Sequence, residues 1–322
     1  MPAGALTSTR TDDGPMLNSI DGSTIGSTFT AGGDCVAVRG TLMQAADPFG
    51  AAPLDASDMA RALALAGCGE CAVEVVAVTG STNEDLVARA RVRQPSGPLL
   101  RAASFQTSGR GRRQRLWRAA PNDALLFSVA IPVGVRTASV PAITLACGVA
   151  LAEYLASRGV PVQLKWPNDI RINGCKLAGI LTELVADRDA RQTLVIGVGM
   201  NVRLDNAARS VIGQPAIALD QLLGKRLGES ALHSREQWIG DLGGAIVAAA
   251  VRFMQDGFGP FCARFNQLLE SRGEMVDVSQ GQADGKPAIS GRLIEVDGLG
   301  QLVIEVEGRH HSVSVGDVSV RQ

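Results

Sequence analysis

Residues 176–202 read KLAGILTELVADRDARQTLVIGVGMNV, in which two apolar runs flank the charged turn ADRDARQ. The runs at 176–185 and 193–202 are rich in the aliphatic and β-branched residues that favour strands. A short polar turn between two such runs predicts an antiparallel hairpin. The segment therefore indicates that the fold contains a β-sheet.

Further strands and helices alternate on the N-terminal side of this hairpin. A capping-box spacing at Ser81-Thr82-Asn83-Glu84 opens a helix that continues through NEDLVARARVR. The predicted strands are 73–78, 99–106, 124–132 and 162–166, and the other predicted helices are 54–67, 139–159, 235–255 and 257–271. This order predicts an α+β fold with a mixed β-sheet flanked by helices, over residues 53–272.

The two ends of the chain differ from this central part. Beyond Gly273, short strands alternate with Gly and Asp turns, which predicts a C-terminal SH3-like β-barrel at residues 273–322. Residues 1–52 are rich in Gly, Ser, Thr and Asp and show no strand or helix period, so we expect a flexible N-terminal tail.

The bulk composition excludes several classes of protein. The net charge is -1, which argues against a protein that holds nucleic acid by bulk charge. No apolar run is long enough to span a bilayer, so we expect no membrane partner. Six cysteines show no framework spacing, and the CxxC at Cys68–Cys71 has no second ligand pair, which favours a cytoplasmic protein over a disulfide or zinc scaffold.

The strongest local signal is GRGRRQRLW, residues 109–117, which lies between two predicted strands. Arg110, Arg112, Arg113 and Arg115 place four guanidinium groups in this loop, and Arg118 follows it. Guanidinium groups bind phosphate or carboxylate in a bidentate manner, and the glycines permit close backbone approach. Taken alone, the loop is equally compatible with a small anionic ligand and with a polynucleotide.

Three later segments each place a polar group at the end of a strand. They are KWPND at 165–169, KLAGI beginning at Lys176, and GVGMN ending at Asn201. Together they supply a carboxylate that can hold a magnesium ion, a lysine and an asparagine, with glycines that leave room for a flat ligand. Beside the arginine loop, this set favours a small anionic ligand.

The chain resembles the bacterial biotin–protein ligases through an ordered set of motifs: Ser81-Thr82-Asn83, Gln106 with Gly109-Arg110-Gly111-Arg112, KWPND, KLAGI and GVGMN. The resemblance covers about residues 53–322. It implies that biotin and ATP form biotinyl-5′-AMP and pyrophosphate, and that biotin then passes to a lysine of a biotin carboxyl carrier protein. The implied cofactor is Mg²⁺.

The resemblance also implies a role for individual residues. The catalytic residues are expected to be Arg112 and Lys176, at the carboxylate and α-phosphate, and the metal ligand is expected to be Asp169. The biotin-binding residues are expected to be Ser81, Thr82, Asn83, Gln106, Gly109, Arg110, Arg112, Trp117, Lys176 and Gly179. The ATP-binding residues are expected to be Arg112, Arg115, Asn168, Asp169, Lys176, Asn201 and Arg321.

The sequence departs from the family pattern in three places. Gln114 stands where many members have a third glycine, and residues 214–217 read QPAI where a bulky residue often covers the adenine. Residues 1–50 have no helical period that would match a DNA-binding domain, so we expect a ligase, monomeric or dimeric, that does not bind nucleic acid. The alternatives are a lipoate or octanoate ligase or transferase of the same fold, and a biotin-responsive DNA-binding regulator.

Overall fold

A computed structural model describes residues 52–134, 140–205, 209, 212–223, 233–279 and 289–321, all within one compact unit, Ala46–Gln322. The predicted tail at 1–52 lies outside the described residues, except for Ala52.

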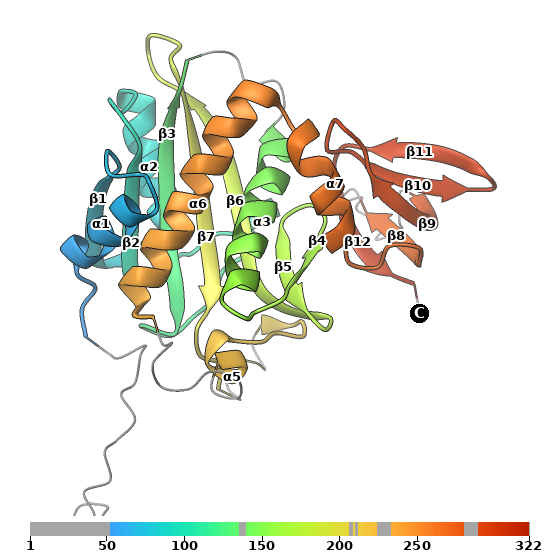
Figure 1. Cartoon of the computed structure of the whole chain (residues 1–322), viewed down its shortest axis with the longest axis horizontal. Helices are drawn as coiled ribbons and strands as arrows, with labels where there is room; N and C mark the ends of the chain where they lie inside the picture. Colours follow the sequence, from blue (N-terminus) through green and yellow to red (C-terminus); the bar gives the residue numbers. More distant parts are fainter. Residues whose placement is uncertain are drawn as a thin grey trace, which may run out of the picture. The chain divides into compact units, whose positions relative to one another are not determined.

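Seven strands of the described chain form one mixed sheet in the order β1-β2-β3-β7-β6-β5-β4 (Figure 1). β1 and β2 pair in parallel, whereas the other neighbours are antiparallel. The strands are β1 (Ala72–Thr79), β2 (Leu99–Gln106), β3 (Ala124–Val133), β4 (Gln163–Lys165), β5 (Asp169–Ile172), β6 (Cys175–Ala186) and β7 (Gln192–Asn201). The hairpin predicted from 176–202 is confirmed as β6 and β7, and it lies inside the sheet.

Helices cover both faces of this sheet. The alternation along β3 explains why: Leu125, Phe127 and Val129 belong to the main apolar cluster, whereas Ala130 belongs to a small cluster under α2. Figure 1 shows α3 and α6 side by side over the main-cluster face. The described helices are α1 (Ala56–Leu65), α2 (Thr82–Val92), α3 (Val140–Ser157), α5 (Leu219–Leu223), α6 (Arg235–Asp256) and α7 (Gly259–Leu268).

The C-terminal strands form a second, antiparallel sheet in the order β11-β10-β9-β8-β12. These strands are β8 (Met275–Ser279), β9 (Ile289–Val296), β10 (Leu302–Val306), β11 (Arg309–Val313) and β12 (Asp317–Val320). Five antiparallel strands agree with the predicted SH3-like domain. The Trp166 indole donates to the Gly300 carbonyl at 3.2 Å. This hydrogen bond links the turn between β9 and β10 to the residue that follows β4.

Two elements were not predicted. β5 begins at Asp169, shortly after the predicted strand at 162–166, and α5 is a single short helix. The arginine loop is irregular, as predicted, apart from one 3-10 turn at Arg112–Gln114. No described helix has the length and apolar character required to cross a membrane.

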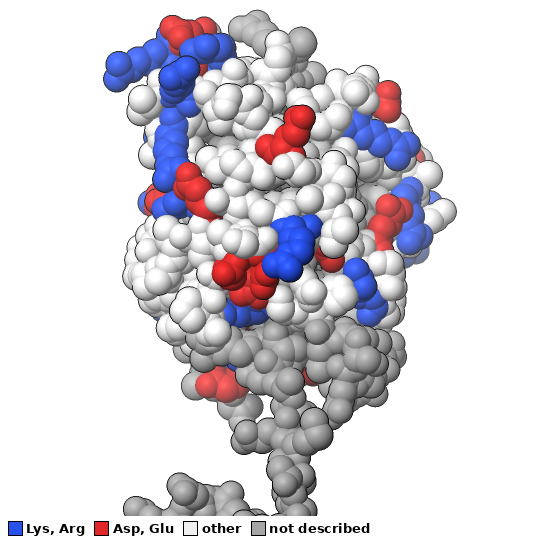
Figure 2. All heavy atoms as spheres, turned by 60° about the vertical axis from the view of Figure 1, so that its left-hand side comes forward, with Lys and Arg blue, Asp and Glu red and all other residues white. Residues whose placement is uncertain are grey.

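The face in Figure 2, which brings the left-hand side of Figure 1 forward, carries scattered charges of both signs. Blue and red side chains lie next to each other there, and most of the described surface in this view is uncharged. Along the upper left edge of the described surface several blue side chains follow one another with red ones beside them, so the basic residues of this face are accompanied by acidic ones.

Candidate functional site

A cavity of about 480 Å³ opens where the arginine loop, the N-terminus of α2, the ends of β2 and β6, and β12 meet. Its lining includes Ser81, Thr82, Asn83, Gln106, Arg110, Arg112, Arg115, Trp117, Ser128, Lys165, Asn168, Asp169, Lys176, Gly179, Gly199, Asn201, Ile212, Gln214 and Asp317. Thirteen of the predicted site residues are in this set: Ser81, Thr82, Asn83, Gln106, Arg110, Arg112, Arg115, Trp117, Asn168, Asp169, Lys176, Gly179 and Asn201.

The first turn of α2 forms the neutral end of the cavity. Ser81 caps the helix, because its hydroxyl accepts from the Glu84 backbone N–H at 3.5 Å. Thr82 donates to Gln106 Oε1 through both its backbone N–H, at 2.7 Å, and its hydroxyl, at 3.1 Å. Since the Thr82 proton is used in this way, the Ser128 hydroxyl at 2.8 Å donates to Thr82. These hydrogen bonds fix Gln106 Oε1 as an acceptor and leave the Gln106 Nε2 amide to donate to a ligand.

Asn83 completes this end of the cavity. Its Nδ2 donates to Glu183 Oε2, which identifies Oδ1 as the acceptor side of the amide. Oδ1 is buried and has no hydrogen-bond partner among the described residues. A Cβ at Gly197 would lie 2.7 Å from this oxygen, so only glycine leaves room for it. A buried acceptor without a partner costs free energy, which is recovered if a ligand donates to it.

Trp117 forms the apolar middle of the cavity. Its ring lies against β7, where a Cβ at Gly199 would be 2.5 Å from Cε2, and against β6, where a Cβ at Gly179 would be 3.4 Å from Cζ3. The Lys176 ammonium lies 5.7 Å from the ring centroid. Glycines on two adjacent strands thus admit the indole and leave a narrow apolar passage toward Lys176.

Lys176 and Asp169 face each other at the charged end. Lys176 Nζ lies 2.6 Å from Asp169 Oδ1, and both side chains are largely buried. Asn201 Nδ2 donates to the carbonyls of Lys176 and Ile217, so it holds the backbone around the lysine. Asn168 Nδ2 donates to the Ile180 carbonyl at 3.0 Å and fixes the turn before Asp169.

The arginine loop folds back on itself and contacts the C-terminal sheet. Arg112 and Arg113 donate to opposite oxygens of Asp317, at 3.0 and 3.1 Å, and Arg115 donates to Oδ2 at 3.1 Å. Burial lowers the pKa of the Arg112 guanidinium below its usual value and outweighs the opposite effect of the Asp317 carboxylate. The guanidinium still carries its charge. Arg110 instead pairs with Glu84 at 2.6 Å. The predicted capping box is therefore half formed, because Glu84 is engaged by the loop.

The loop conformation explains two positions of the motif. A Cβ at Gly109 would lie 2.8 Å from the Trp117 carbonyl and 3.1 Å from Gln106 Nε2, so a side chain would displace Gln106. Gln114 has φ of 60°, a left-handed conformation that glycine adopts at lower cost. The residue that departs from the family pattern therefore stands where a glycine fits the backbone better.

Arg321 does not line the cavity; its backbone N–H donates to the Met275 carbonyl at the edge of the second sheet. Gly109 is not among the lining residues either. Sequence reasoning missed Ser128, Glu183 and Asp317. The first two lie within strands without a motif of their own, and Asp317 lies 202 residues beyond Arg115.

The donor set is compatible with a magnesium ion held mainly by a substrate. Mg²⁺ in proteins commonly binds one or two carboxylates together with phosphate oxygens and water. Asp169 offers one carboxylate to the cavity, and the described residues contain no cluster of three or more metal-ligating side chains. The residues thus fit an ion that arrives with a polyphosphate and do not form a complete protein cage.

A family model described as the biotin/lipoate A/B protein ligase family matches residues 75–201. The biotin–[acetyl-CoA-carboxylase] ligase of Mycobacterium tuberculosis is 33% identical over 280 residues, which cover 83% of this chain and 95% of that protein. The bifunctional ligase/repressor BirA of Escherichia coli is 30% identical over 250 residues, covering 77% and 74% of the two chains.

Among solved structures, a biotin protein ligase from Aquifex aeolicus in complex with biotin and ATP superposes with a TM-score of 0.62 at 24% identity. The match covers 78% of this chain and 99% of that one. At this identity the likeness establishes the fold alone, and it confirms the predicted fold class.

Proposed function

Because the chain belongs to the biotin protein ligase family, we propose that it activates biotin with ATP and transfers it to a lysine of a biotin carboxyl carrier domain. The single observation that carries this proposal is the pair of amide groups at the neutral end. The Gln106 Nε2 group can donate, and the buried Asn83 Oδ1 can accept. A cyclic urea such as that of biotin presents one carbonyl and adjacent N–H groups, which is the complementary pattern.

The apolar passage beside Trp117 has the character that an aliphatic carboxylic acid requires. It leads from the amide pair toward the Lys176 ammonium, which lies over the same indole. A ligand with a polar ring at one end and a carboxylate at the other would therefore place its carboxylate near Lys176. This order along the cavity supports Trp117 and Gly179 as the residues that contact the aliphatic chain of the ligand, and Lys176 as the group that binds its carboxylate.

The charged end supports the activation step. A carboxylate oxygen attacks the α-phosphorus of ATP, pyrophosphate leaves, and the product is a mixed anhydride between biotin and AMP. Lys176, Arg112 and Arg115 supply positive charge where the two anions meet, which reduces their repulsion. Asp169 would hold Mg²⁺, and that ion would neutralise phosphate charge during the displacement.

The second step needs less from the protein. The acceptor lysine attacks the acyl carbon as a free amine, AMP departs with the electron pair of the acyl–oxygen bond, and the new amide loses a proton. Arg112 and Arg115 come from a loop that closes one side of the cavity, so they can retain AMP and its anhydride while the acceptor enters. The roles of the predicted site residues, Arg321 included, remain part of this proposal.

The nucleotide base has a candidate cover in this chain. Ile212 and Gln214 line the cavity, and the segment after them is fixed to β6 because Lys176 N–H donates to the Pro215 carbonyl at 2.9 Å. We assign Ile212 to the apolar cover that the QPAI segment itself does not supply.

An incubation of the purified protein with ATP, Mg²⁺, biotin and an acceptor carrier domain tests the proposal, with avidin blotting as the readout. ATP-dependent labelling of the acceptor is expected, and an acceptor whose target lysine is replaced by arginine serves as the control. No labelling of the intact acceptor would overturn the assignment.

The competing substrate class is an acid without a ureido ring, such as lipoate or octanoate. Such an acid has no N–H to donate to Asn83 Oδ1, so that buried acceptor would stay unpaired. Biotin should therefore raise the melting temperature of the protein more than lipoate or octanoate at equal concentration. Equal shifts with all three acids would remove the argument from Asn83.

The proposal extends to the setting of the enzyme. The described cysteines Cys68, Cys71, Cys147, Cys175 and Cys262 are free, and burial raises the pKa of Cys71 to about 11. Free thiols support a reducing, cytoplasmic location. A mobility-shift experiment at several salt concentrations tests DNA binding, and we expect no complex. Light scattering tests whether the protein is a monomer or a dimer.

A further inference from the structure

The N-cap and first turn of α2 carry three residues of the neutral end of the cavity, Ser81, Thr82 and Asn83, yet few apolar side chains anchor this helix. Its buried apolar residues are Leu86, Val87 and Ala90, and they belong to a small cluster with Ala130, Val185 and Val195. This cluster begins at Leu86 and includes neither Thr82 nor Asn83. The position of the first turn of α2 therefore depends strongly on its polar partners.

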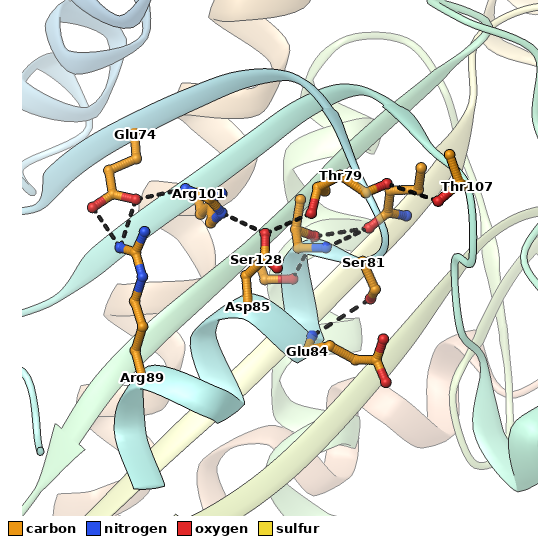
Figure 3. A network of polar contacts seen from close by, with 11 residues as sticks. Glu74, Thr79, Ser81, Glu84, Asp85, Arg89, Arg101, Thr107 and Ser128 are labelled. Carbon is orange, nitrogen blue, oxygen red and sulfur yellow. Dashed lines mark hydrogen bonds and ion pairs between the residues drawn. The ribbon is translucent and has the colours of Figure 1, made fainter. Parts of the chain in front are cut away.

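Asp85 is the residue that joins this turn to the sheet. Its Oδ2 accepts from the Thr79 hydroxyl at 2.7 Å and from Arg101 Nε at 2.8 Å (Figure 3). Thr79 lies at the end of β1 and Arg101 lies on β2. Asp85 follows Thr82 by three residues, so the two side chains are neighbours on the helix surface.

The contacts continue from Arg101 to the far end of α2. Arg101 Nη1 donates to Glu74 on β1 at 2.7 Å, and Arg89 on α2 donates to both oxygens of Glu74, at 2.6 and 2.7 Å. The Arg101 side chain is only 12% exposed, so its two ion pairs are screened less than pairs on an open surface. Figure 3 shows Arg101 between Glu74 and Asp85, so that one guanidinium fixes both strands and the helix.

This network shares its strands with the ligand-binding groups. Thr79 is the register partner of Gln106 in the parallel pair, and Thr82 donates twice to Gln106 Oε1. A small rotation of α2 would move Thr82 away from Gln106 and release the amide orientation that leaves Nε2 to the ligand. The same rotation would move Asn83 Oδ1 relative to Gly197.

We propose that Asp85, held between Thr79 and Arg101, is a positioning residue for recognition of the ligand's ureido ring, acting through Thr82 and Gln106. This inference rests on the proposed function, because it concerns the same cavity. Asp85 does not line the cavity, so its effect is transmitted through the first turn of α2.

Asp85→Asn tests the proposal, since the amide keeps the size of the side chain and loses its charge. We expect the Kd for biotin, measured by calorimetry without ATP, to rise about five- to tenfold. The KM for ATP should change by less than about twofold, because the anion-binding groups lie at the other end of the cavity. Asp58→Asn is the matched control: Asp58 also lies in the first turn of a helix and pairs with an arginine, Arg61, but α1 carries no residue of this site.

A double-mutant cycle separates positioning from general stability. Thr82→Val removes one donor to Gln106, and if Asp85 acts through Thr82, the effects of the two changes on biotin Kd will be less than additive. Thr79→Val should reproduce part of the Asp85→Asn effect, and Thr79→Ser, which keeps the hydroxyl, should restore the wild-type Kd. If Asp85→Asn does not fold, this Thr79 pair carries the test.

The outcomes distinguish the two proposals. Absence of biotin binding by the wild-type protein contradicts the proposed function. Wild-type binding with an unchanged Kd in both Asp85→Asn and Thr79→Val, even with a lower melting temperature, overturns the positioning role. Additive effects of Asp85→Asn and Thr82→Val overturn the route through Thr82.

Discussion

The two ends of the cavity meet their hydrogen-bonding needs in opposite ways. At the neutral end, Asn83 Oδ1 is buried without a partner, and Gln106 keeps a donor for the ligand. At the charged end, Lys176 is already paired with Asp169, and Arg112 is already paired with Asp317. The neutral end thus has a buried acceptor without a partner, whereas the lysine and the arginine of the charged end already face carboxylates.

The difference follows from the cost of burying each kind of group. A neutral acceptor without a partner costs about 1–3 kcal/mol, which a folded protein can tolerate. A buried ion without a partner costs several kcal/mol, so charged groups need counter-ions in the absence of ligand. Ligand binding therefore adds hydrogen bonds at the neutral end and exchanges partners at the charged end, which gives the two ends different responses to mutation and salt.

Removal of Lys176 should have the largest effect. Lys176→Ala is expected to lower kcat for adenylate formation by about 10³, because it removes the fixed charge closest to the reacting anions. It also leaves Asp169 without its cation. The double variant Lys176→Ala/Asp169→Asn restores charge balance, so it should recover the melting temperature but not the activity. Recovery of activity in the double variant would show that the lysine serves only to balance Asp169.

Gly199→Ala should have the next largest effect, and it acts between the two ends. The new Cβ would lie 2.5 Å from the Trp117 ring, so the indole must move into the passage that we assign to the aliphatic chain. We expect biotin affinity to fall about 10²-fold, as measured by calorimetry. Gly97→Ala is the control, since a Cβ there meets no atom within 4 Å. A variant that binds biotin normally would place the aliphatic chain elsewhere.

Asp317→Asn should strengthen ATP binding, whereas the two preceding changes weaken activity or biotin binding. Arg112, Arg113 and Arg115 all donate to this carboxylate, and an ATP phosphate must take its place for the arginines to reach the nucleotide. Loss of the charge should lower the KM for ATP about threefold at low salt, with a smaller change at high ionic strength, where exposed pairs are screened. Biotin affinity should not change. A raised KM for ATP would mean that Asp317 holds the arginines in their binding positions.

The sequence predicted the elements of this site better than their contacts. Local patterns were sufficient for the β6–β7 hairpin, for the strand at 99–106 and for the loop at 109–117, because periodicity and turn chemistry are encoded within a few residues. They could not predict that Asp317 accepts hydrogen bonds from three arginines, or that Arg101 links β1 to α2 through ion pairs. Such pairs depend on how distant segments pack, and a lone Asp or Arg carries no signal of its partner.

Glu74→Gln should have the smallest effect, confined to stability behind the neutral end. Burial raises the pKa of Glu74, but hydrogen bonds from Arg89 and Arg101 outweigh it and lower the pKa below the usual value. A carboxylate with a lowered pKa in the folded state stabilises the protein above the unfolded-state pKa, and this contribution disappears as the pH falls through the folded-state pKa. The variant should therefore melt slightly below the wild type at pH 7, and the difference should shrink below about pH 4.5.

Scanning calorimetry across this range measures the difference in melting temperature, with Glu70→Gln, a change at an exposed carboxylate, as control for loss of a charge. A constant difference at all pH values would show that Glu74 stabilises the strands by packing, and that the network behind the neutral end does not depend on its charge.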